Sequence, residues 1–176
     1  MSGYGRNMTP AQLLTDAFER ILQTATAAVE DLTDEQLATR VGPEANSIAW
    51  LVWHLARVQD DHVADVAGAE QVWTAQDFVS RFDLPFDSSA IGYGMSSEEV
   101  GHVRASAGLL ADYVRAVHDA SVAYLSTLTP EDLDRVVDER WDPPVTLGVR
   151  LVSVVSDDLQ HAGQAAYVRG LLTAGS

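Results

Sequence analysis

The stretch NSIAWLVWHLARVQDDHVADVAG, residues 46–68, decides the fold class. Asn46 or Ser47 can cap the start of a helix, and Gly68 is a typical residue just after a helix end. Between these residues the apolar side chains recur at the spacing of one helical face. The segment therefore predicts a long helix whose apolar stripe needs other elements to cover it. The stripe consists of Ile48, Leu51, Val52, Leu55, Val58 and Val66.

Three other long segments show the same helical period. The first starts at Thr9-Pro10 and continues to about residue 31, the second covers residues 96–127 with a break near residue 106, and the third covers residues 146–172. Helices of 20 to 27 residues span about 30 to 40 Å each. With no convincing alternating strand, the sequence predicts an all-α four-helix bundle that forms a single domain over residues 1–176.

The connection between the second and third predicted helices is unusually long. Residues 68–96 contain Pro85, Gly92 and Gly94 and show no sustained period. So long a connection allows those two helices to run parallel, which gives an up-down-down-up bundle. Long irregular connections in compact domains are often functional loops, and we expect this one to cover the bundle end near His54.

Composition excludes several classes of function. The net charge is −15 and the pI about 4.4, so a nucleic-acid backbone or an anionic membrane surface is an unfavourable partner. The chain has no cysteine, which rules out disulfides and an internal thiol nucleophile. It also lacks a signal-peptide pattern and an apolar run long enough to span a membrane. We expect a cytoplasmic protein in which any thiol chemistry uses a bound small thiol.

Three residues suggest a metal site. Asp157 and His161 are four residues apart on the last predicted helix, so both can reach one ion, and His54 could approach from a facing helix. A catalytic metal needs such a three-ligand set with one position left open. The alternatives are that His54 and His161 only pack, that Asp157 faces solvent, or that Asp158 replaces Asp157 as the ligand.

Other polar residues could contact a bound cofactor or substrate. Asp61 is about 10 Å along the helix from His54, too far to share one ion, and is a candidate pocket residue. Gln164 could bond to a ligand or to the backbone, and Arg57 could contact an anion or lie at the surface. Trp50, Trp53, Trp73, Tyr93 and Trp141 could line a pocket, although aromatic residues in a bundle are usually core.

The stretch SIAWLVWHLAR, residues 47–57, together with HAGQAAYVRG, residues 161–170, resembles the DinB-like superfamily. Within it, the chain is similar to the actinobacterial branch of mycothiol-dependent S-transferases. The exclusive use of arginine among the basic residues also resembles the codon bias of a GC-rich genome. This resemblance implies the up-down-down-up bundle, a homodimer, and a divalent metal, zinc above all or nickel, held by His54, Asp157 and His161. Many members have histidine at position 157, and a carboxylate there resembles the mycothiol-dependent branch.

The resemblance implies two classes of function. In the first, the protein is a metal-dependent transferase that conjugates mycothiol to electrophilic small molecules, or an isomerase of the maleylpyruvate type if the thiol leaves again. The metal stabilises the thiolate, and no separate general base is identifiable. In the second, the protein is a non-catalytic, stress-related metal-binding bundle.

Overall fold

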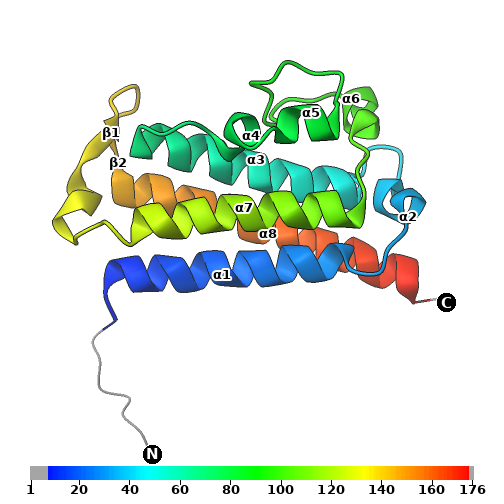
Figure 1. Cartoon of the computed structure of the whole chain (residues 1–176), viewed down its shortest axis with the longest axis horizontal. Coiled ribbons are helices and arrows are strands. Elements are labelled where there is room, and N and C mark those ends of the chain that lie inside the picture. The colour runs from blue at the N-terminus through cyan, green and yellow to red at the C-terminus, as the bar shows by residue number, and fades with distance from the viewer. Residues whose placement is uncertain (1–7, 175–176) are drawn as a thin grey trace, which may run out of the picture.

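Four long helices form the framework of the protein, whose computed structural model describes residues 8–174 (Figure 1). They are α1 (Pro10–Val29), α3 (Ile48–Ala67), α7 (Ala107–Leu125) and α8 (Leu147–Thr173). Helix α3 packs against α7 and α8, and α1 packs against the same two helices from the other side. The colour gradient shows α3 and α7 running in the same direction, opposite to α1 and α8. The predicted all-α, up-down-down-up bundle is confirmed.

The helix starts follow the capping residues in the sequence. Thr9, Ser47, Ser106 and Thr146 each accept a hydrogen bond from a backbone N–H three residues later. The predicted break in the third segment is real. It separates α6 (Ser97–His102) from α7, because Ser106 begins a new helix.

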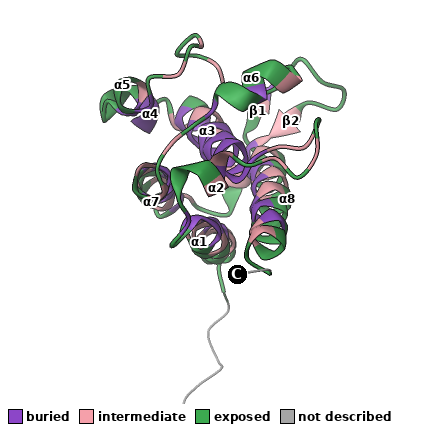
Figure 2. Ribbon diagram, turned by 90° about the vertical axis from the view of Figure 1, so that its right-hand side faces the viewer, coloured by how far each residue is buried: buried purple, intermediate pink, exposed green. Residues whose placement is uncertain are grey.

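Helix α3 lies at the centre of the molecule and is buried on almost every side (Figure 2). The sequence suggested a single apolar stripe, but the crossover packs over the face of α3 that the other long helices leave open. As a result, polar side chains of α3 are also buried. They include His54, Arg57, Gln59 and Asp60.

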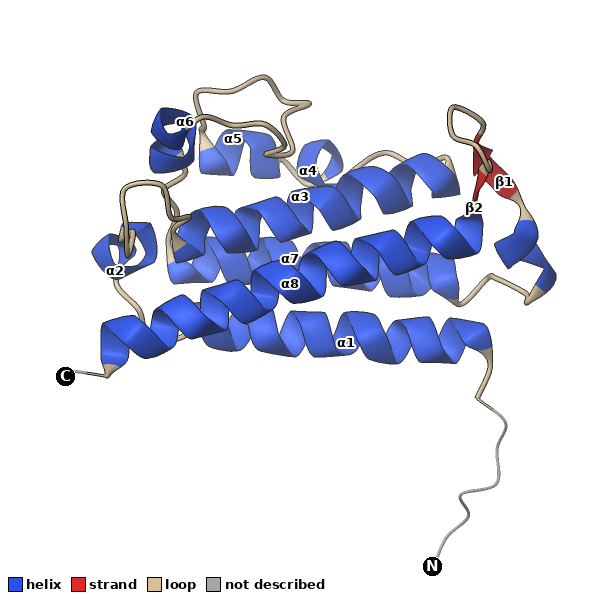
Figure 3. Ribbon diagram, turned by 180° about the vertical axis from the view of Figure 1, so that it is seen from behind, coloured by secondary structure: helices blue, strands red, loops and turns tan. Residues whose placement is uncertain are grey.

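The crossover between α3 and α7 contains the short helices α4 (Val72–Ala75) and α5 (Phe78–Phe82), and α2 (Asp34–Ala38) lies in the α1–α3 connection. Asp60 fixes the start of the crossover, because its carboxylate accepts hydrogen bonds of 2.8 Å from the backbone N–H groups of Val72 and Trp73. The segment lies along the outer side of α3 and does not close the bundle end (Figure 3), but it does reach His54 as expected, because Ile91 contacts the imidazole.

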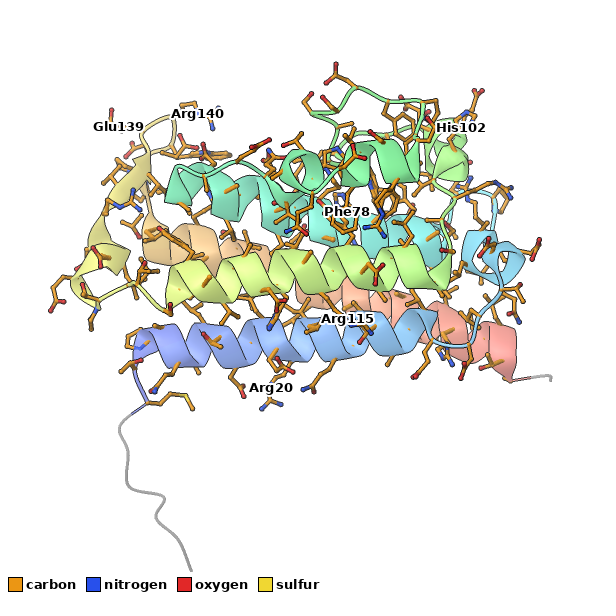
Figure 4. All side chains as sticks on the ribbon, viewed as in Figure 1. Arg20, Phe78, His102, Arg115, Glu139 and Arg140 are labelled. Atoms are coloured by element: carbon orange, nitrogen blue, oxygen red, sulfur yellow. The ribbon has the colours of Figure 1, made fainter. Side chains whose placement is uncertain are left out.

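A small antiparallel hairpin precedes α8. It follows the 3-10 turn η1 (Glu131–Asp134) and consists of β1 (Val136–Asp138) and β2 (Val145–Thr146). Arg140 lies in the connection between the two strands, at the edge of the molecule (Figure 4). This two-stranded sheet is the only sheet in residues 8–174, so it leaves the predicted all-α bundle intact there. Over the same residues, none of the helices combines the length and the apolar composition that crossing a membrane requires.

Candidate metal centre

The structure brings His54, Asp157 and His161 to one point between α3 and α8. One donor atom from each side chain lies within 4.8 Å of the other two. Asp157 Oδ2 is 3.7 Å from His161 Nε2 and 4.0 Å from His54 Nε2. Metal–nitrogen bonds of about 2.0–2.1 Å separate two ligand atoms by slightly more than 3 Å, so small side-chain rotations would fit these three atoms to one ion.

Neighbouring groups hold His54 in the form that a metal ligand needs. Its Nδ1 contacts the backbone oxygen of Ile91, and because that oxygen can only accept, Nδ1 carries the proton. Nε2 is then left with a lone pair on the side of Asp157. The ring also stacks on Trp50, with centroids 4.5 Å apart. Burial lowers the pKa of His54 below its ordinary value of 6.5, despite the bond to Ile91, so the imidazole is neutral at pH 7.

His161 and Asp157 complete the site in the same way. His161 Nδ1 is 3.1 Å from Gln164 Oε1, an oxygen that can only accept, so the lone pair of this imidazole is also on Nε2. Gln164 thus orients a candidate ligand, as outer partners of metal-bound histidines commonly do. Asp157 Oδ2 is buried and has no hydrogen-bond partner within residues 8–174. A buried carboxylate oxygen is costly without such a partner, and a cation would supply one.

The donor set suits a borderline divalent ion. Two imidazole nitrogens and one carboxylate oxygen are the ligands of many catalytic zinc sites, which keep a further position open for water or substrate. The three residues therefore fit the group that the sequence resemblance implies.

Gly92, in the crossover, is a feature of the site that the sequence did not reveal. Its φ is +104°, a conformation that residues with a Cβ rarely adopt. A Cβ built at this position would lie only 2.3 Å from His54 Nδ1. The absence of a side chain at Gly92 thus allows the backbone of Ile91 to reach His54. The only signal in the sequence is the pair of glycines on either side of Tyr93.

Asp158 does not belong to the cluster of donor atoms. Its side chain is fully buried, and neither of its oxygens has a hydrogen-bond partner within the described part of the chain. Burial, together with the charge of Asp157, raises the pKa of Asp158 well above its usual value. The geometry therefore favours Asp157 over Asp158 as the carboxylate that faces both histidines.

The other predicted contact residues lie in different places. Arg57 is not at the surface: it is fully buried, donates to Gln71 and Tyr113, and lies 3.6 Å from a carboxylate oxygen of Asp60. Surface exposure was the wrong expectation, because the crossover covers this side of α3. Asp61 is partly exposed and accepts a hydrogen bond from Gln71, so it helps to hold the crossover.

A pocket of about 320 Å³ adjoins the candidate metal centre at Asp157, which is part of its wall. It lies over α3 and α8, between Tyr93 of the crossover and Trp141 of the hairpin connection. Of the aromatic residues that could line a pocket, these two do so, whereas Trp53 and Trp73 belong to the core. The pocket is lined by Val58, His62, Tyr93, Trp141, Val145, Arg150, Ser153, Val154 and Asp157.

His62 predicts a pH dependence of stability. Burial, followed by the nearby charge of Arg150, lowers the pKa of His62 below 6.5. Unfolded histidine binds a proton near pH 6.5, whereas folded His62 binds one only at lower pH. The free energy of unfolding therefore has its full value above pH 6.5 and decreases as the pH falls, because protonation then favours the unfolded chain. We expect urea titrations at pH 7.5 and 5.5 to show a larger loss of unfolding free energy in the wild type than in His62→Gln. Equal losses would show that His62 titrates normally.

Comparisons with known proteins identify the family and support the fold. The family model described as Mycothiol-S-transferase matches residues 13–174. A crystal structure of a conserved protein from Enterococcus faecalis is 31% identical, with a TM-score of 0.88 over 97% of this chain and 100% of that one. A DinB-like protein from Bacillus cereus, 21% identical, has a TM-score of 0.59 over 97% and 95% of the two chains. No curated protein gives a significant match. The chain belongs to the mycothiol-S-transferase family and has the fold of the DinB-like superfamily.

Proposed function

We propose that the protein is a metal-dependent transferase that joins mycothiol, through its sulfur, to electrophilic small molecules. The observation that carries this proposal is the convergence of two Nε2 lone pairs and a carboxylate oxygen that has no hydrogen-bond partner in residues 8–174, beside a pocket and in a chain of the mycothiol-S-transferase family. The absence of cysteine is consistent with it, since the thiol must then come from a bound molecule.

In this proposal His54, Asp157 and His161 hold one divalent ion, with zinc as the first candidate because two imidazoles and a carboxylate suit it. When bound, such an ion supplies a positive charge that stabilises a thiolate at neutral pH, where a free thiol with a pKa near 8.5 is only a few per cent ionised. Ile91 and Gln164 fix the two imidazole rings, and the burial of His54 keeps its imidazole neutral, with Nε2 free of a proton. Trp50 packs against both rings and excludes water from that side.

A conjugation assay tests the proposal directly. Purified protein should consume mycothiol and a reporter electrophile faster than the uncatalysed reaction, lose this activity on chelation, and regain it with a divalent ion. Mycothiol should be a better substrate than glutathione or bacillithiol. Metal-independent rates, equal for the three thiols and no faster than without protein, would instead support a non-catalytic metal-binding bundle.

A further inference from the structure

The pocket beside Asp157 has two aromatic walls that are unusually exposed. Tyr93 is 58% exposed and Trp141 is 64% exposed, and they come from two separate segments, the crossover and the hairpin connection. Large aromatic rings left open to solvent on a binding surface usually serve as contact surfaces. Their flat faces suit the C–H face of a sugar or cyclitol ring.

The polar groups of the pocket suit hydroxyl groups. His62, Arg150 and Ser153 line it, together with the apolar side chains of Val58 and Val154. A hydroxyl group both donates and accepts, so it can pair with any of these three polar side chains. The volume of about 320 Å³ lies at the lower end of the range of pockets for small molecules.

The charge of Arg150 is already matched by a carboxylate. Its guanidinium donates to Asp138 at 3.0 Å, and its other terminal nitrogen is 3.3 Å from His62 Nδ1. Asp138 is buried, and its bonds to Arg140, together with the charges of Arg140 and Arg150, hold the pKa of its carboxyl far below the usual value, so it stays ionised. Asp157 adds a negative charge to the wall. Among the described residues, the pocket wall therefore contains no cationic side chain that lacks an acidic partner. A ligand that carries a carboxylate finds no free positive charge there.

We propose that this pocket holds the uncharged polyol part of the thiol co-substrate, and that Asp138, by neutralising Arg150, makes the pocket select against thiols whose bodies carry carboxylates. The inference rests on the proposed function for its choice of ligand. Mycothiol carries a neutral pseudodisaccharide on its cysteine, whereas glutathione carries two carboxylates. Asp138 acts through Arg150 and is thus a specificity-determining residue that does not itself touch the ligand.

Binding to metal-free protein tests the selection without using enzyme activity. The probes are S-methyl mycothiol and S-methyl glutathione, whose blocked sulfurs make any metal unnecessary, and the readout is Kd by calorimetry. In Asp138→Asn, the freed Arg150 should strengthen binding of S-methyl glutathione roughly three- to tenfold, and high salt should remove the gain. Binding of S-methyl mycothiol should change by less than about twofold. Adding Arg150→Gln should abolish the gain.

Asp112→Asn is the matched control for charge. Asp112 is also a carboxylate paired with an arginine, Arg81, at 3.0 Å, but it lies on α7, outside the pocket. The Asp112→Asn substitution removes the same negative charge but does so outside the pocket, so it should leave the affinities for both probes unchanged. Equal gains for S-methyl glutathione in Asp138→Asn and Asp112→Asn would overturn the role of Asp138.

The aromatic wall is tested separately, in a variant that does not disturb the ion pair. Trp141→Ala should weaken binding of S-methyl mycothiol roughly five- to tenfold. Tyr167→Ala is the control, because Tyr167 is a similarly exposed aromatic residue on α8 that does not line the pocket. Trp141-dependent binding in a protein without transferase activity would support the pocket and refute the proposed function. Mycothiol-dependent activity with unchanged Kd values in Trp141→Ala and Asp138→Asn would overturn the pocket assignment alone.

Discussion

Replacing His161 by alanine should weaken the binding of a divalent metal by more than about a hundredfold. Loss of an outer partner of a ligand typically costs ten- to a hundredfold, and loss of the ligand itself should cost more. At a metal concentration of a thousand times the wild-type Kd, bound metal stabilises the folded protein by about 4 kcal/mol, and a hundredfold weaker site retains only about 1.4 kcal/mol. Metal content after dialysis and the metal-dependent rise in Tm measure the change.

Two further variants make this result specific. Gln164→Ala removes the side chain that orients the ring of His161 and should have an intermediate effect, about ten- to a hundredfold. His102→Ala, on α6, removes a histidine outside the candidate site and should leave metal binding unchanged. If His161→Ala bound metal with wild-type affinity, or if Asp158→Asn and not Asp157→Asn abolished binding, the proposed ligand set would be wrong.

The bundle could be predicted from the sequence because its determinants are local. Capping residues such as Ser47 and Ser106 satisfy backbone groups within one turn, and the apolar period is a property of each helix alone. The short crossover helices were missed because four or five residues are too few to show a period. The full burial of α3 was missed as well, because it depends on where the crossover packs.

The candidate site likewise has a local part that the sequence predicts and a non-local part that it does not. Asp157 and His161 share a helix, so their spacing alone brings them together. His54 was a candidate because it lies on a second long helix, and the family resemblance supported that choice. The bond from His54 to Ile91 joins residues 37 positions apart, and nothing in the spacing of the sequence specifies it. The pairing of Arg150 with Asp138 likewise depends on a hairpin that was not predicted. What the sequence does not show is how the connections complete a site that the long helices begin.

Gly92→Ala should therefore disturb the site more than a typical loop substitution. A methyl group at this position would lie 2.3 Å from His54 Nδ1, and no flexible side-chain end is there to move away, because the ring is held between Ile91 and Trp50. The left-handed backbone adds its own strain. We expect a loss of unfolding free energy of about 2–4 kcal/mol. Metal affinity should also fall by about ten- to a hundredfold, because displaced crossover backbone no longer orients His54.

Gly94→Ala separates backbone strain from the clash with His54. Gly94 also has a positive φ, +72°, but a Cβ built there meets no other described atom within 4 Å. This variant should lose only about 1 kcal/mol and keep its metal affinity. Denaturant titration of both metal-free variants, followed by metal titration, measures the two effects. Equal losses in the two variants would attribute the effect to backbone strain, and wild-type metal affinity in Gly92→Ala would show that the crossover does not position His54.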